Sequence, residues 1–218
     1  MGKVVTIDGP AASGKSSVSR ELARRLGWKW VSTGAFYRGL AFAALQMHIE
    51  LDDVKSLSEL SRSDIWKVVM NDDMTRVYFK DQDVTEAIGH EDVGSFASRV
   101  SSYPNVRKSL LENQRSCSSA SSLVAEGRDC GTVVFPQAEV KIYLTASSAH
   151  RAQRRATEHG ASAEEIALSQ KVRDQQDSTR KAAPLQVPEN AYVVDTTNMD
   201  LKQVVDAVEA HVRQKINL

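Results

Sequence analysis

The chain has 218 residues, with 28 Lys and Arg against 28 Asp and Glu, so its formal net charge at pH 7 is zero. This length suits one well-packed domain with inserted segments better than two independent domains. The balanced charge excludes a global field that attracts nucleic acid or anionic membranes. No apolar run is long enough for a membrane span or for the core of a signal peptide. We therefore expect a cytoplasmic monomer that binds neither nucleic acid nor a membrane.

The first predicted element is a β-branched strand that ends at Gly9. After four further residues, Gly14-Lys15-Ser16 opens an amphipathic helix, which gives the order strand, G-x-x-x-x-G-K-[ST], helix of a phosphate-binding P-loop. Glycines let the backbone N–H groups turn inward, and the helix N-terminus adds free N–H groups and a positive dipole end. The alternative is a chance turn rich in Gly and Ser, which the flanking strand and helix disfavour.

A P-loop predicts binding of a nucleoside triphosphate with Mg²⁺. Lys15 is expected to reach the β- and γ-phosphates, and the Ser16 hydroxyl is expected to ligate the metal ion. The predicted nucleotide-binding residues are Gly9, Pro10, Ala11, Ala12, Ser13, Gly14, Lys15, Ser16 and Ser17.

The next elements place polar residues beyond a strand end. Helical spacing continues until Gly27, residues 28–32 form a short strand, and a long apolar helix follows from about Thr33. Thr33, Tyr37 and Arg38 therefore lie near a helix start just after a strand. In open α/β sheets, ligands bind in the crevice outside the carboxyl ends of the strands, so these residues are candidates for a binding site.

The character of the sequence changes over about residues 64–85. Three short β-type runs are separated by turn signals at Asn71-Asp72-Asp73 and Asp81, which predicts a small antiparallel meander inserted in the core. Two helices are expected next, over about residues 90–102 and 105–115, with Pro104 between them.

Strands and helices alternate again in the rest of the chain. Strands are expected over residues 122–126, 140–144 and 192–195, and a last helix over residues 201–215. Two arginine-rich helices, over residues 149–159 and 163–180, are separated by Gly160. The pattern predicts an α/β fold in which a parallel sheet of about five strands is flanked by helices.

Several arginines lie near predicted strand ends or share a helix face. The spacings of four and three in Arg173, Asp177 and Arg180 would place these three side chains on one helix face. Phosphoryl transfer requires mainly positioning and charge neutralisation, which arginines supply. For each arginine considered alone, the alternative to a binding role is a solvated position on the protein surface. For Arg38 and Arg128, the neighbouring glycines and strand ends favour a binding role.

Four motifs together resemble the bacterial cytidylate kinase family, a group of P-loop nucleoside monophosphate kinases. They are Ile7-Asp8-Gly9-Pro10 with Gly14-Lys15, Thr33-Gly34-Ala35-Phe36-Tyr37-Arg38, Glu126-Gly127-Arg128-Asp129-Cys130-Gly131-Thr132-Val133-Val134-Phe135-Pro136, and Arg173-Asp174 with Asp177, Arg180 and Ala183-Pro184-Leu185. The resemblance covers essentially the whole chain in the expected order, and the third motif is far more specific than the P-loop.

The resemblance implies Mg²⁺-dependent transfer of the γ-phosphoryl group of ATP to CMP or dCMP. It implies one P-loop kinase domain over residues 1–218, with a monophosphate-binding insert at about 62–98 and a closing, arginine-rich helical lid at about 151–182. Catalytic roles are implied for Lys15, Arg128, Arg173 and Arg180.

The resemblance also implies the contacts of the acceptor nucleotide. Its phosphate would be bound by Thr33, Arg38, Arg128 and Arg180, and Tyr37 would pack beside it. The cytosine edge would be read by Ser98, Arg107 and Asp129, and the ribose would contact Arg173 and Asp177. A carboxylate such as Asp129 accepts a hydrogen bond from the cytosine N4 amino group and opposes the uracil oxygen, so CMP is expected to be preferred over UMP.

Some alternatives stay open at this stage. Another P-loop kinase acting on UMP, AMP or shikimate is the nearest rival. A nucleotide-dependent switch is disfavoured because the sequence lacks D-x-x-G and N-K-x-D motifs. Glu126 could act near Mg²⁺ through water or satisfy backbone groups. The run Arg151, Arg154 and Arg155 could line the lid and stack on adenine, or form a solvated helix face.

The sequence departs from the family at three positions. Ser32 stands where many relatives carry Asp, and Gln176 and Ser178 stand where some relatives carry further arginines.

Overall fold

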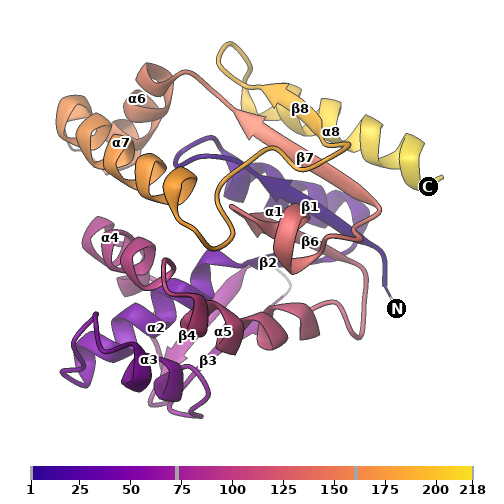
Figure 1. Ribbon diagram of the computed structural model, residues 1–218. Coiled ribbons are helices and arrows are strands. Elements are labelled where there is room, and N and C mark those ends of the chain that lie inside the picture. The colour runs from indigo at the N-terminus through magenta and orange to yellow at the C-terminus, as the bar shows by residue number, and fades with distance from the viewer. Residues whose placement is uncertain (1, 72–73, 160–161, 218) are drawn as a thin grey trace.

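The computed structural model describes residues 2–71, 74–159 and 162–217. Its main sheet has five strands in the order β2-β6-β1-β7-β8, all paired in parallel (Figure 1). Their bounds are β1 Val4–Asp8, β2 Lys29–Ser32, β6 Leu123–Gly127, β7 Val140–Thr145 and β8 Tyr192–Asp195. The predicted parallel sheet of about five strands is therefore confirmed.

All five residues of β1 are buried, because other elements pack on both faces of the sheet. Val5 and Ile7 point to the face covered by α1 (Lys15–Leu26) and α8 (Leu201–Ile216). Asp8 points the other way, toward the short π-helical turn η2 (Cys130–Val134). Parallel pairing places Asp8 beside Gly127 at the carboxyl edge of the sheet. The P-loop and the segment after β6 consequently meet at this edge.

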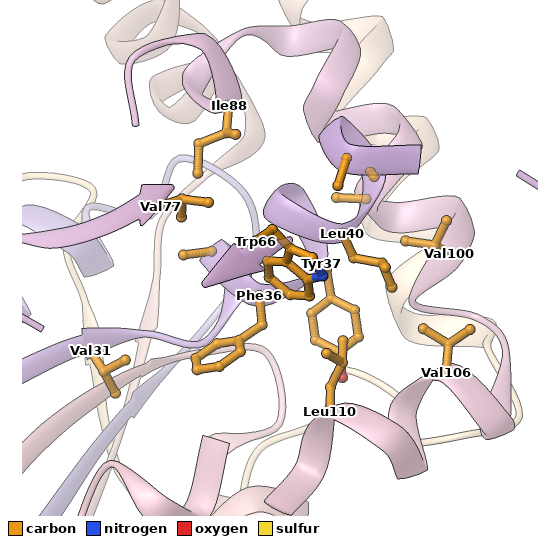
Figure 2. Packing of buried hydrophobic residues seen from close by; sticks show 14 of the residues in the cluster. Val31, Phe36, Tyr37, Leu40, Trp66, Val77, Ile88, Val100, Val106 and Leu110 are labelled. Atoms are coloured by element: carbon orange, nitrogen blue, oxygen red, sulfur yellow. The ribbon is translucent and has the colours of Figure 1, made fainter. Parts of the chain in front are cut away.

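The inserted meander forms a separate antiparallel sheet in the order β3-β4-β5. Its strands are β3 Trp66–Met70, β4 Thr75–Phe79 and β5 Gln82–Asp83. Trp66 packs with Phe36, Tyr37 and Leu40 of α2 (Gly34–Gln46), as Figure 2 shows. A Cβ atom at Gly39 would lie 2.9 Å from the Trp66 ring, so a glycine allows this close approach. A further helix, α3 (Val54–Leu60), precedes the meander and was not predicted.

The remaining helices surround the carboxyl edge of the main sheet. Two of them are α4 (Glu91–Val100), preceded by the 3-10 turn η1 (Ala87–Gly89), and α5 (Pro104–Ser116). The arginine-rich segment forms α6 (Ser148–His159) and α7 (Ala163–Thr179), which pack on each other (Figure 1). None of the described helices combines the length and apolar character that crossing a membrane requires.

One local prediction about the arginine-rich helices is corrected. Helix α7 ends at Thr179, and Arg180 adopts extended backbone, so Arg180 does not share a helix face with Arg173 and Asp177. A continued helix would bring the Pro184 ring against the Arg180 carbonyl group, so α7 ends before this proline. The turn predicted at Asp72-Asp73 and the break at Gly160 lie outside the described residues.

Candidate functional site

The P-loop lies at the carboxyl edge of the main sheet, between β1 and α1. A Cβ atom at Gly9 would lie 2.1 Å from the Leu144 carbonyl oxygen, so the chain passes β7 too closely for any other residue. Gly14 adopts a φ of 86° at the N-cap of α1, a conformation that glycine favours. The sequence therefore uses its two motif glycines at the positions where the backbone requires them.

Lys15 is buried and points back along the P-loop. Its Nζ donates to the Pro10 carbonyl oxygen at 2.6 Å and lies 3.4 Å from Ser13 Oγ. Burial, and then the positive charge of Arg128, lower the pKa of Lys15 to about 7. The hydrogen-bond partners of the Lys15 ammonium group are uncharged. A bound anion would stabilise its positive charge much better than they do.

Ser16 and Glu126 bring two oxygen ligands together beside the P-loop. Ser16 Oγ donates to Glu126 Oε1 at 3.0 Å, and both residues line the central cleft. A hydroxyl and a carboxylate are the oxygen donors that Mg²⁺ prefers. Ser16 and Glu126 could therefore hold a divalent metal ion together.

Asp8 is a fully buried carboxylate that the sequence analysis gave no role. Its two oxygens accept hydrogen bonds from the backbone N–H groups of Cys130 at 2.8 Å and Gly131 at 2.7 Å. Burial raises its pKa from 3.8 to about 6, although both hydrogen bonds oppose the shift. Asp8 thus fixes the turn that carries Arg128 and Asp129 into the cleft.

Asp129 forms a buried ion pair with Arg107 through its Oδ2 atom. Arg107 also donates to the Ser101 carbonyl oxygen at 3.2 Å, and its guanidinium lies 5.2 Å from the centre of the Tyr37 ring. The other oxygen of Asp129 is 3.6 Å from Arg180 Nη2, beyond hydrogen-bonding distance. Burial raises the pKa of Asp129, while both arginines oppose this shift. One carboxylate oxygen is therefore oriented by the protein and the other can accept a ligand donor.

The other arginines surround the same cleft from different elements. Arg128 Nε donates to Asp177 Oδ2 at 2.8 Å, and Arg173 Nη1 donates to Glu91 Oε1 at 2.8 Å. Arg38 Nη1 donates to the carbonyl oxygens of Ile88 at 2.5 Å and His90 at 3.0 Å.

Two arginines at α7, Arg173 and the C-cap residue Arg180, contact different neighbours within the cleft. Arg173 lies next to Arg38, since both guanidinium groups approach Gly94. Arg180 instead lies near Asp129 and Asp177, at 3.6 and 3.5 Å. Arg173 therefore lies beside the phosphate-binding candidate Arg38, and Arg180 lies beside the base-reading candidate Asp129.

The positive charge of the cleft is incompletely paired. Among the described residues, the buried Arg173 Nε and Arg180 Nη2 atoms have no hydrogen-bond partner. Burial and neighbouring arginines lower the pKa of Arg38 to about 10, and burial and Arg107 lower that of Arg180. An anion in the cleft would relieve this repulsion and satisfy the free donors.

Helices α6 and α7 rest directly on the P-loop. Asp174 Oδ1 accepts from the Ala11 N–H at 3.1 Å, while Arg151 donates to the Ala11 carbonyl oxygen at 2.8 Å and to Asp174 Oδ2 at 2.7 Å. Arg154 donates to the Thr196 carbonyl oxygen at 2.6 Å. These contacts exclude a solvated helix face for Arg151 and Arg154.

Most of the predicted site residues meet in one cleft. Its lining includes Ala11, Ala12, Lys15, Ser16, Thr33, Tyr37, Arg38, Ser98, Arg128, Asp129, Arg173, Asp177 and Arg180. The other predicted residues, which support or adjoin this lining, are Gly9, Pro10, Ser13, Gly14, Ser17 and Arg107.

The sequence analysis missed Asp8 and Glu91, and it gave no role to Asp174. For Asp8 a signal exists, because it is the one acidic residue in the otherwise uncharged run from Val4 to Gly14. For Glu91 and Asp174 the sequence holds no such signal, since their partners lie 82 and 163 residues away.

Comparisons with known proteins agree with this geometry. A family model described as cytidylate kinase matches residues 5–214. A cytidylate kinase of Bdellovibrio bacteriovorus is 68% identical over 217 residues, covering 99% of this chain and 100% of the relative. A cytidylate kinase of Shewanella loihica is 40% identical over 219 residues, covering 98% and 95%.

A solved structure supports the fold alone. A gluconokinase from Sinorhizobium meliloti superposes with a TM-score of 0.52 at 16% identity, covering 99% of this chain and 94% of that chain. Together with the whole-chain matches, these findings confirm the family expected from the motifs: the chain belongs to the cytidylate kinase family.

Proposed function

We propose that this chain transfers the γ-phosphoryl group of ATP to CMP or dCMP, giving ADP and CDP or dCDP, in the cytoplasm and as a monomer. Relatives that carry the name cytidylate kinase match it over nearly its whole length, which supports the reaction. The balanced charge supports small-molecule partners rather than nucleic acid.

The observation that carries the proposal at the site is the incomplete pairing of the cleft arginines. Arg173 and Arg180 keep buried N–H donors without described partners, and burial together with the nearby arginines lowers the pKa of Arg38. These groups line the same cleft as Lys15 of the P-loop. A cleft with a triphosphate-binding loop and a second cationic cluster suits a donor and an acceptor that both carry phosphate.

On the donor side, the P-loop backbone and Lys15 would bind the ATP phosphates. Ser16 and Glu126, whose oxygens lie 3.0 Å apart, would hold Mg²⁺, with Glu126 acting directly or through water. When bound, the metal ion neutralises charge on the transferred group. Binding of phosphates would also return Lys15 to its fully protonated state.

On the acceptor side, Arg38, Arg128 and Thr33 would bind the CMP phosphate, with Arg180 contributed by the lid. Charge-assisted hydrogen bonds from arginines orient the acceptor phosphate toward the γ-phosphoryl group and lower the repulsion between two anions. Arg128 is buried, and the negative charge of Asp177 raises its pKa against the effect of burial, so its charge is permanent.

The base would be read by a set of groups beside the Tyr37 ring. Asp129 would accept from the cytosine N4 amino group through its Oδ1 atom, while Arg107 and Ser98 contact the remaining polar edge. Arg173 and Asp177 would contact the ribose. With UMP the same carboxylate faces a carbonyl oxygen and loses its hydrogen bond, which reduces binding by about 1–3 kcal/mol.

The two inserted segments would supply closure. We infer a monophosphate-binding insert over about residues 62–98 and a lid over about residues 151–182 within one domain of residues 1–218. Contacts from Asp174 and Arg151 to Ala11 support a lid that reaches the P-loop. Closure excludes water, which would otherwise compete with the acceptor for ATP.

Phosphorus NMR of ATP and CMP with Mg²⁺ and the purified chain tests the reaction. We expect signals of CDP and ADP to replace those of ATP and CMP, because the γ-phosphoryl group moves intact. The Lys15→Ala variant serves as the control for the P-loop. Formation of inorganic phosphate and ADP without CDP would contradict the proposal.

A further inference from the structure

Glu91 connects the acceptor-side helix α4 with both lid helices. Its Oε1 atom accepts from Arg173 Nη1 at 2.8 Å and from Ser169 Oγ at 3.1 Å, both on α7. Its Oε2 atom lies 3.3 Å from Arg155 Nη2 on α6. In Figure 1, α4 lies below α7 in the view, and Glu91 is the first residue of α4. One carboxylate therefore makes three polar contacts across the boundary between the core and the lid.

The next turn of α4 holds two arginines against its backbone. A Cβ atom at Gly94 would lie 2.7 Å from Arg38 Nη2 and 3.3 Å from Arg173 Nη1, so the helix passes close beneath both guanidinium groups. Arg38 also donates to the carbonyl oxygens of Ile88 and His90, immediately before the helix. The start of α4 thus fixes Arg38 on one side and Arg173 on the other.

The positive charges of the arginines around Glu91 explain why a carboxylate is needed at this position. Burial and the positive charges of Arg173 and Arg155 lower the pKa of Arg38 to about 10. Burial alone would raise the pKa of Glu91, but Arg173 and Arg155 lower it to about 2. Glu91 is therefore ionised at neutral pH and offsets the repulsion among these three arginines.

We propose that Glu91 is a positioning residue that latches the lid onto α4 and orients Arg173 beside Arg38 for the acceptor nucleotide. The predicted effect of Glu91 on turnover rests on the proposed function. The predicted effect of Glu91 on the mobility of α6 and α7 does not depend on it. Removal of the carboxylate should loosen α6 and α7 and allow Arg173 to leave Arg38.

Asp92 is a matched control for the simpler alternative that Glu91 only complements the dipole of α4. Both residues are acidic and lie in the first turn of the same helix. Asp92 is exposed, and its Oδ1 accepts from the adjacent Val93 N–H at 2.7 Å. Asp92→Asn therefore removes a charge from the helix N-terminus without touching the contacts made by Glu91.

The test compares Glu91→Gln, Glu91→Ala and Asp92→Asn in the full chain by two readouts. The first is hydrogen exchange of the α6 and α7 amides without ligands, and the second is kcat and KM for CMP and ATP. Both Glu91 variants should speed exchange in α6 and α7 and lower kcat/KM for CMP by about tenfold, since partly exposed charged hydrogen bonds are lost. KM for ATP should change little, and Asp92→Asn should match the unchanged protein in both readouts.

A double variant tests whether Glu91 acts through Arg173. In an Arg173→Lys background, Glu91→Gln should lower kcat/KM for CMP much less than it does alone, because the oriented guanidinium is already absent. Glu91 variants that equal Asp92→Asn in exchange or in kcat/KM for CMP would overturn the latch. Failure of the unchanged chain to phosphorylate CMP would reject the proposed function, while the exchange comparison would still decide whether the lid is latched.

Discussion

Replacement of Asp8 by Asn removes one charge from the centre of the fold with almost no change in shape. Asp8 accepts two backbone hydrogen bonds, and burial raises its pKa from 3.8 to about 6. Because the pKa is raised in the folded state, protonation of Asp8 favours folding. This contribution is complete below the unfolded pKa and is lost as the pH rises through about 6.

The structure gives the size of this effect. At about pH 5, one unit below the folded pKa, protonation of Asp8 should favour the folded state by about 1.4 kcal/mol relative to about pH 8. Asp8→Asn cannot gain this free energy. When the pH is lowered from about 8 to about 5, the unfolding free energy of the unchanged chain should therefore rise by about 1.4 kcal/mol relative to that of Asp8→Asn.

Urea unfolding at a series of pH values, followed by tryptophan fluorescence, measures this difference. Asp64→Asn, at an exposed position, is the control and should give a curve parallel to that of the unchanged chain. Because the amide can accept from only one of the two N–H groups, Asp8→Asn should also raise KM for CMP more than KM for ATP. Stability curves that stay parallel for Asp8→Asn from about pH 8 to about pH 5 would refute the reasoning.

The further predictions concern three residues that line the cleft. Lys15→Ala should lower kcat at least about 100-fold with an unchanged melting curve, and retained turnover would reject its role at the phosphates. Because burial lowers the pKa of Lys15 to about 7, ATP affinity measured by calorimetry should fall above neutral pH, whereas Lys15→Arg should show no such fall. Asp129→Ala should raise KM for CMP about five- to 150-fold and KM for ATP far less, and equal effects would move Asp129 out of the acceptor site. Arg180→Ala should lower kcat/KM for CMP at least about tenfold but shift the melting temperature by only about 2 °C, since burial and Arg107 already disfavour its charge. A large loss of thermal stability with normal kinetics would make Arg180 a structural residue.

The parts of the fold that could be predicted are those with local causes. The β-branched run before Gly9 and the glycine motif specify the strand and loop directly, and the turn residues around the meander specify its antiparallel strands. Helix α3 was missed because its seven residues span less than two full turns, too few for a clear periodic pattern.

The candidate site divides in the same way. Motifs near strand ends, such as Thr33 to Arg38 and Arg128-Asp129, could be placed because parallel strands share one carboxyl edge. Pro184 signals that α7 ends nearby, but the exact end at Thr179 could not be foreseen, because a proline excludes a continued helix without specifying the residue at which it stops.

Contacts of α6 and α7 with the rest of the fold were beyond prediction, because they join residues far apart in the sequence. Glu91 reads as an ordinary acidic residue in the first turn of a helix, a position that such residues favour in any protein. Only the approach of α6 and α7 to α4 makes it a partner of Arg155 and Arg173.

The most direct test of the central claim is ADP release from ATP and Mg²⁺ with a panel of acceptors. The panel contains CMP, dCMP, UMP, AMP, GMP and shikimate, with a reaction lacking any acceptor as control. We expect turnover led by CMP or dCMP, with UMP slower because Asp129 opposes its carbonyl oxygen. Turnover led by another acceptor, or ADP release that is equally fast without one, would contradict the claim.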